Sequence, residues 1–273
     1  MNFVYDWNEA REKYTKENKF SILNLNVSYY YIQSTDSDIL VLQNGKELLL
    51  NNASSGLQSV VPLLVLIDYL TQGLFDEKIT DSVDENQEIS DVVGKYFLKI
   101  IKNRPVIIKQ MNDEKSALLT SNESDKISGL IKLIESRNKY HFSQFIIEEP
   151  EQNLFPEAQR DLVYYLLNRI NDNEREHKLL ITTHSPYILY ALNNCMMGYL
   201  VKEDIPKEVQ NELLSKQSWI NPELVSVWEI EKDKGTIKLI QDENTKTVSK
   251  HYFNKIMNEV MDEYYEMLSY LKI

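Results

Sequence analysis

Two adjacent glutamates, Glu148 and Glu149, follow the segment His141–Ile147, which is predicted to be a buried β-strand. Side chains alternate along a strand, so neighbouring carboxylates point to opposite sides and cannot form the facing acid pair that a glycosidase needs. They can instead do two separate jobs. One can hold Mg²⁺ together with substrate phosphates, and the other can orient and deprotonate a water molecule. The alternative is a pair of solvated glutamates at a strand end.

A single histidine, His184, follows a second apolar run, Lys178–Thr182, and precedes Ser185 and Pro186. The ends of neighbouring strands in a parallel sheet lie close together, which would bring this imidazole near the glutamates. It could then donate a hydrogen bond to a phosphoryl oxygen or to an attacking water. A purely structural histidine is the alternative.

The segment Ser54-Ser55-Gly56 stands at the start of an apolar helical pattern. It offers hydroxyl groups, backbone N–H groups and the positive end of a helix dipole, a combination that suits an anion. An ordinary N-cap from Ser54 or Ser55 is the alternative.

In the first half, helix and strand patterns surround this segment. The first 20 residues are polar and suggest a helix, and Asn44-Gly45 predicts a hairpin turn. A helix is expected to follow the segment, kinked or shortened by Pro62. The expected strands are Ser21–Ile32, Ile39–Gln43 and Glu47–Leu50, and the expected helix is Leu57–Leu70. Residues 76–91, with seven acids, indicate a solvated surface insertion.

The second half predicts βαβ units and therefore a parallel sheet flanked by helices. A helix with proline at its first position, Pro156–Ile170, separates the two apolar runs, and another helix starts near Tyr187. A long amphipathic helix is expected over Lys250–Leu271. Its apolar face is expected to pack on this protein's own sheet rather than on a partner.

Composition excludes several classes of protein. The 42 acids and 30 bases give a net charge of −12, which argues against nonspecific nucleic-acid binding through a sheath of basic residues. Cys195 is the only cysteine, so CxxC metal sites and disulfides within the chain are excluded. Neither a signal peptide nor a membrane span is evident, so a cytoplasmic location is expected. The 7 glycines form neither GxGxxG nor GxxxxGK[ST].

Four stretches, in this order, resemble motifs of the ABC-type ATPases. The similarity is to the prokaryotic AAA branch of P-loop NTPases, related to the overcoming-lysogenization-defect proteins and more distantly to the structural-maintenance-of-chromosomes proteins. Ala53–Ser59 resembles the signature motif, Phe145–Glu149 the Walker B strand, Glu151–Pro156 the D-loop and Ile181–Pro186 the switch-histidine segment. The resemblance covers residues 21–240. It departs from the family at Asn153 and Phe155, where relatives carry histidines.

In that family two nucleotide-binding units sandwich ATP with Mg²⁺. The resemblance implies that Glu148 serves the Mg²⁺, that Glu149 activates the water and that His184 senses the γ-phosphate. It also implies a D-loop containing Glu151, Gln152 and Asn153. The signature residues expected to contact ATP held by a partner are Ser54, Ser55, Gly56 and Gln58.

The fold implied is an ABC-ATPase-like α/β domain, mainly a parallel sheet with an antiparallel N-terminal portion. Relatives begin with a strand and a Walker A phosphate loop, which these 273 residues do not contain, so the chain resembles the C-terminal portion and is expected to be inactive alone. The expected regions are 21–52 (β portion), 53–75 (signature helix), 76–140 (helical insertion), 141–240 (Walker B to switch core) and 249–272 (C-terminal helix).

Three hypotheses remain open. The first is an ATPase module whose phosphate loop lies on a separate polypeptide or in an upstream segment. It is expected to form a homo- or heterodimer with the subunit or segment that carries Walker A. The second is a non-hydrolysing interaction module derived from such an ATPase. The third is an unrelated α/β binding protein. Contact with nucleic acid through the assembly stays open, and no membrane partner is expected.

Overall fold

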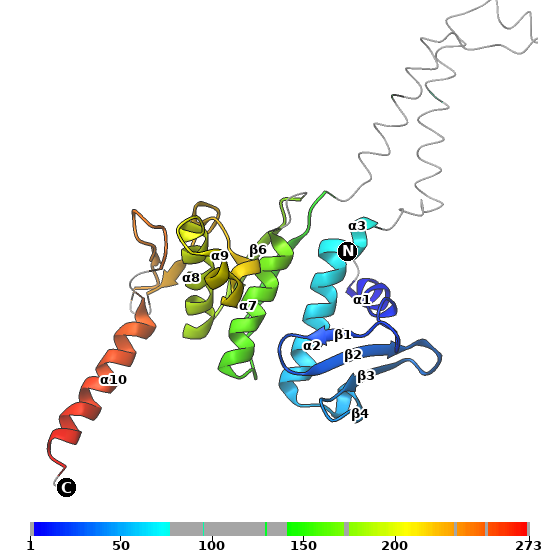
Figure 1. The fold of residues 1–273 in the computed structure, drawn as a ribbon, viewed down its shortest axis with the longest axis horizontal. Helices are drawn as coiled ribbons and strands as arrows, with labels where there is room; N and C mark the ends of the chain where they lie inside the picture. The colour runs from blue at the N-terminus through cyan, green and yellow to red at the C-terminus, as the bar shows by residue number, and fades with distance from the viewer. Residues whose placement is uncertain are drawn as a thin grey trace, which may run out of the picture. The chain divides into compact units, whose positions relative to one another are not determined.

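The computed structural model describes residues 3–76, 95, 129, 141–171, 175–231, 234–248 and 251–271 (Figure 1). The chain divides into two compact units, one of residues 1–73 and 142–273 and the other of residues 74–141. Apart from residues 76, 95 and 129, the helical insertion expected over residues 76–140 lies outside the described residues. The larger unit holds every candidate site residue.

An antiparallel sheet of four strands forms the N-terminal part, in the order β1-β2-β3-β4. It follows helix α1 (Phe3–Glu12), and the turn at Asn44-Gly45, where Gly45 has φ +78°, joins β3 to β4 as expected. The strands are β1 (Phe20–Ile22), β2 (Val27–Ile32), β3 (Ser37–Val41) and β4 (Glu47–Leu49).

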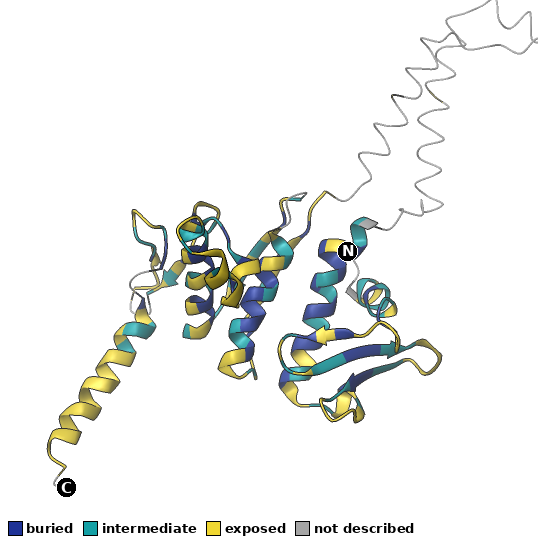
Figure 2. Cartoon of the chain, viewed as in Figure 1, coloured by how far each residue is buried: buried dark blue, intermediate teal, exposed yellow. Residues whose placement is uncertain are grey.

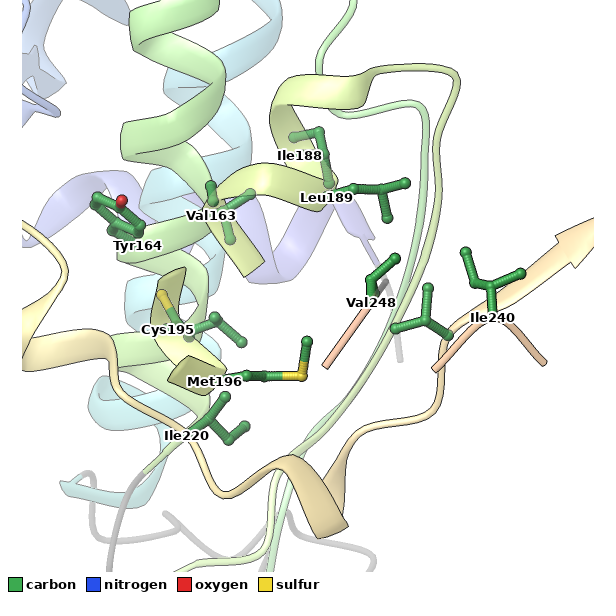
Figure 3. Packing of buried hydrophobic residues seen from close by; sticks show 12 residues of the cluster. Val163, Tyr164, Ile188, Leu189, Cys195, Met196, Ile220, Ile240 and Val248 are labelled. Atoms are coloured by element: carbon green, nitrogen blue, oxygen red, sulfur yellow. The ribbon is translucent and has the colours of Figure 1, made fainter. Parts of the chain in front are cut away.

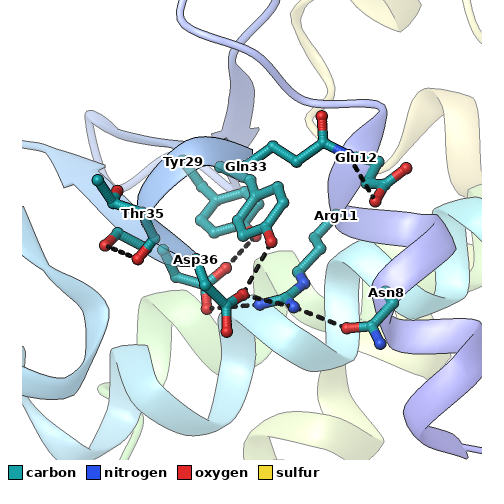
Figure 4. A network of polar contacts seen from close by, with 10 residues as sticks. Asn8, Arg11, Glu12, Tyr29, Gln33, Thr35 and Asp36 are labelled. Atoms are coloured by element: carbon teal, nitrogen blue, oxygen red, sulfur yellow. Dashed lines mark hydrogen bonds and ion pairs between the residues drawn. The ribbon is translucent and has the colours of Figure 1, made fainter.

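Arg11 ties α1 to this sheet (Figure 4). Its guanidinium lies 2.8 Å from the carboxylate of Asp36 and 4.2 Å above the ring of Tyr31. Beside it, the buried Tyr29 hydroxyl donates a 2.6 Å hydrogen bond to Asp38. Burial is the larger cause and this hydrogen bond the smaller cause that raise the pKa of Tyr29 well above its ordinary value. These contacts hold the helix against the sheet.

Helix α2 (Ser55–Asp68) begins after the N-cap Ser54, as expected. It continues through Pro62 without ending, so the expected shortening is wrong. A π-helical turn (Tyr69–Gly73) and the short α3 (Leu74–Asp76) follow. The carboxylate of Asp68 lies 2.7 Å from the guanidinium of Arg169 in helix α7 (Pro156–Ile170), and this ion pair joins the two halves of the larger unit.

The second half contains a parallel pair of strands, β5 (Gln144–Glu148) and β6 (Lys178–Thr182), with α7 (Pro156–Ile170) between them in the chain. Helix α8 (Pro186–Val201) packs on α7, and around Cys195 and Met196 they form an apolar core (Figure 3). Burial raises the pKa of Cys195 to about 12. The remaining elements are α9 (Lys207–Glu212), β7 (Trp228–Ile230), β8 (Ile237–Leu239) and α10 (Tyr252–Ser269).

One face of the β5–β6 sheet is open, which corrects the expectation of a buried strand. Phe145 is buried, but Ile146 is 72% exposed and its cross-strand neighbour Leu180 is 53% exposed. In the described residues each strand has a hydrogen-bonded partner on one edge only. Of the mainly parallel sheet that was expected, the described residues contain two parallel strands. Parallel sheets are normally covered on both faces, and the described residues cover this one on one face.

Helix α10 also differs from expectation. None of its described residues is buried, so its apolar face does not pack on the protein's own sheet (Figure 2). Among the described helices, none is long and apolar enough to cross a membrane.

Candidate functional site

Glu149 is the first residue after β5, and its backbone conformation is unusual. Its N–H donates to the carbonyl of Thr182 at 2.9 Å, which continues the pairing with β6. Its φ is +44°, a left-handed conformation that residues other than glycine seldom adopt. The chain turns away from the sheet at this point. The expected alternation of side chains between the two faces of the strand therefore holds up to Glu148 and does not extend to Glu149.

The turn brings the Glu149 carboxylate to His184, as the strand-end argument predicted. One oxygen, Oε1, lies 3.1 Å from Nε2 of His184. The other, Oε2, accepts a 2.7 Å hydrogen bond from the side-chain amide of Gln152. Both oxygens are thus held in a defined direction, while the carboxylate stays partly exposed to solvent. An oriented, accessible carboxylate is what activation of a water molecule requires.

Glu151 fixes the segment that carries His184. Its Oε1 accepts hydrogen bonds from the Thr183 hydroxyl at 2.7 Å and from the His184 backbone N–H at 2.8 Å. The residue is buried, and its Oε2 makes no hydrogen bond within the described part of the chain. The sequence pointed to Glu151 as part of a loop, but its contact with Thr183 carried no recognisable signal.

Gln159, in α7, adds a second connection between residues 149–155 and the start of α8. Its amide nitrogen donates to the Leu154 carbonyl at 2.8 Å. Its amide oxygen accepts a hydrogen bond from Ser185, whose hydroxyl also caps α8 by accepting from the N–H of Tyr187. Residues 149–155 are therefore connected to the segment of His184 twice, through Glu151 and through Gln159.

Glu148 lies at the end of β5 and pairs in register with Thr182 of β6. By alternation along the strand, it shares the open face of the sheet with Ile146. A carboxylate beside a hydroxyl suits Mg²⁺, which is commonly bound through one or two carboxylates plus substrate phosphates. The described residues hold no group of three or more acidic, histidine or cysteine side chains arranged for a metal.

The serine-rich segment forms a tight helix start. Ser54 Oγ accepts a long, 3.5 Å hydrogen bond from the N–H of Leu57. The Gln58 amide donates to the carbonyls of Asn51 and Ala53 at 3.0 and 2.9 Å. Ser54, Ser55 and Gln58 remain exposed, whereas Gly56 is buried.

Gly56 is buried because the loop after β5 lies against it. A Cβ added at this position would meet the backbone carbonyl of Asn153, which itself has φ +61°. The serine-rich segment and the loop of Glu149 are therefore in contact within one chain. The sequence suggested each segment separately but not this contact.

Comparison with protein families gives a match that covers part of the chain. The model of an AAA ATPase domain matches residues 127–189. This range includes Glu148, Glu149, the loop 150–155 and His184, but it leaves out the serine-rich segment. The match supports an AAA-type ATPase, a kind of protein that binds ATP with Mg²⁺. No curated protein matches the chain.

Proposed function

We propose that this chain is the hydrolytic part of an ABC-type ATPase whose phosphate loop comes from elsewhere. The observation that carries the proposal is the Glu149 carboxylate held between His184 and Gln152 at the ends of parallel strands. Glu149 would accept a proton from the water that attacks the γ-phosphate. His184 would lie beside the same water or a γ-phosphate oxygen.

Two further features support the proposal. Mg²⁺ would neutralise phosphate charge, with Glu148 and the Thr182 hydroxyl as its protein-side groups. The exposed side chains of Ser54, Ser55 and Gln58, next to the N-terminus of α2, would face ATP held by a partner subunit. The buried Gly56 would then support the loop rather than touch the nucleotide.

The open face of the β5–β6 sheet fits a phosphate loop on another segment. A two-stranded sheet is marginal by itself, and a parallel one is normally covered on both faces. A strand and helix bearing a GxxxxGK[ST] loop would cover Ile146 and Leu180 and bring backbone N–H groups and a lysine to the phosphates. Such groups supply most of the transition-state stabilisation in phosphoryl transfer.

The test combines binding and hydrolysis. Calorimetry of the purified chain with Mg·ATP is expected to give no saturable binding. Addition of a polypeptide with the missing GxxxxGK[ST] segment, sought in the neighbouring coding sequence, should produce phosphate release. Glu149→Gln should lower that rate by about 10²- to 10⁴-fold. The matched control is Glu157→Gln, at an exposed position in the first turn of α7, and it should leave the rate unchanged.

Saturable binding of Mg·ATP by the chain alone would disprove the need for an external phosphate loop. Equal rates for the wild type and Glu149→Gln would remove Glu149 as the base. A stable complex with the second polypeptide that never releases phosphate would instead favour the non-hydrolysing interaction module.

A further inference from the structure

Helix α10 presents a broad apolar stripe to solvent. Its exposed apolar side chains recur at helical spacing from the second turn to the end: Met257, Val260, Met261, Tyr264, Met267, Leu268 and, just beyond the helix, Leu271. A contiguous apolar surface of this kind is unusual on a monomer and marks an interaction site. The stripe extends over most of a helix that is about 27 Å long at 1.5 Å per residue.

The first turn of α10 is fixed to the body of the larger unit. The N–H of Tyr252 donates to Glu229 of β7 at 2.7 Å, and Asn254 accepts a 2.8 Å hydrogen bond from Tyr190 of α8. Phe253 packs against the core cluster. These contacts set the direction of the helix, so the stripe cannot fold back on the chain's own sheet without breaking them.

A second apolar surface adjoins this fixed turn. The β7–β8 hairpin has two cross-strand pairs on one face, Trp228 with Leu239 and Ile230 with Ile237. All four side chains are exposed, by 49% to 73%. The Glu229 that receives the N–H of Tyr252 belongs to β7, so the hairpin and the base of α10 are neighbours.

We propose that a second copy of this chain covers both surfaces, through an antiparallel pair of α10 helices formed without nucleotide. With the two-fold axis beside Asp262, heptad spacing puts an apolar residue opposite an apolar residue in each layer. Within the exposed stripe the layers are Met257 with the other copy's Met267, and Val260 with its Tyr264. The antiparallel direction also carries the end of each helix towards the other copy's hairpin.

The charges on α10 leave the stripe itself free for contact with a second copy, because the acids lie mostly away from it. The helix contains four acids and one lysine. These charged residues lie on the side away from the stripe and along one of its edges. An anionic lipid surface or a nucleic acid would be repelled. Among the acids only Glu263 borders the stripe, where it would approach its own symmetry mate. A two-fold pair uses every contact twice, which helps a short helix reach a stable interface.

Sedimentation equilibrium of the full chain, free of nucleotide, tests the proposal between about 1 and 100 µM. The apparent mass should rise from 32.1 kDa towards twice that value. Val260→Glu and Ile230→Glu should each weaken dimerisation by at least about 10-fold. Both side chains are exposed in one copy, so the fold should survive, which circular dichroism would verify. Asn258→Glu, on the polar side of the helix, should change it less than about twofold, and Glu263→Gln should strengthen it.

Three outcomes would overturn the proposal. A chain that stays monomeric throughout the range has no such dimer. A dimer that ignores Val260→Glu does not use the stripe. A dimer that ignores Ile230→Glu brings the helices together without the hairpin, as a parallel pair would. Because no nucleotide is present, failure here leaves the proposed ATPase function untouched.

Discussion

The backbone carbonyl of Asn153 lies against the Cα of Gly56, so close that no side chain fits between the two segments. Through this contact the start of α2 supports the loop whose Gln152 holds Glu149. A nucleotide bound at the exposed serines would therefore act on a segment that touches the loop of the candidate base.

Gly56→Ala should destabilise the fold by about 1–3 kcal/mol, because the added methyl group must displace the Asn153 carbonyl. Urea unfolding followed by circular dichroism measures the effect. Ser55→Ala, at the neighbouring exposed position, is the control and should stay within about 0.5 kcal/mol of the wild type. Equal stabilities for the two variants would mean that the loop does not rest on Gly56.

Glu151→Ala should cost about 1–3 kcal/mol for each donor left without an acceptor, here the Thr183 hydroxyl and the His184 N–H. Glu151→Gln keeps an acceptor oxygen and should cost less. Hydrogen exchange at the His184 amide distinguishes the two, because only Glu151→Ala should abolish its protection. Unchanged exchange in Glu151→Ala would contradict the observed bond.

Gln152→Leu should lower hydrolysis by the completed assembly by about 10- to 100-fold, because Glu149 loses one of the two contacts that orient it. The effect should appear in kcat rather than in KM. Gln33→Leu provides the matched control, because it removes another Gln–Glu hydrogen bond, the one to Glu12 in α1. Equal loss in both variants would point to a general effect of the substitution.

Stability should fall on acidification in part because of His251. Burial lowers the pKa of this histidine below its ordinary value of 6.5, although Glu229 opposes the shift. The unfolded state therefore takes up the proton first, and the free energy of unfolding decreases as the pH falls below about 6.5. His251→Phe should reduce the loss measured by urea unfolding between about pH 7.5 and 5.5. His141→Gln, at an exposed position, should not reduce it.

The two faces of β5 should respond differently to substitution. Phe145→Ala should cost about 3–5 kcal/mol, because a buried ring is lost. Ile146→Thr should stay within about 0.5 kcal/mol in the free chain, because that side chain is exposed. Thermal unfolding of both variants checks the assignment. A large cost for Ile146→Thr would show that the face is already covered.

Local signals in the sequence sufficed for several elements. Proline at the first position predicted α7 over Pro156–Ile170, and an apolar run predicted β6 over Lys178–Thr182. The approach of His184 to Glu149 followed from the geometry of parallel strands. These features depend on residues near one another in the chain or on one general rule of topology.

Other features depend on what covers a surface, which an apolar pattern does not specify. The sequence predicted that Ile146 is buried and that the apolar residues of α10 pack against the protein's own sheet, yet Ile146 is exposed and no described residue of α10 is buried. The bonds made by Glu151 and Gln152 were also beyond prediction. They are made by a loop with left-handed conformations at Glu149 and Asn153, and the residue types at these two positions gave little indication of a positive φ.

The burial of Cys195 has a practical consequence for experiments on this protein. Its pKa of about 12 keeps the thiol protonated at neutral pH, and the residue has no solvent contact. Maleimides and other thiol reagents react with exposed thiolates, so the natural sequence already serves as an unreactive background. A single cysteine placed on α10 or beside the Glu149 loop would carry a fluorophore or spin label at one known position.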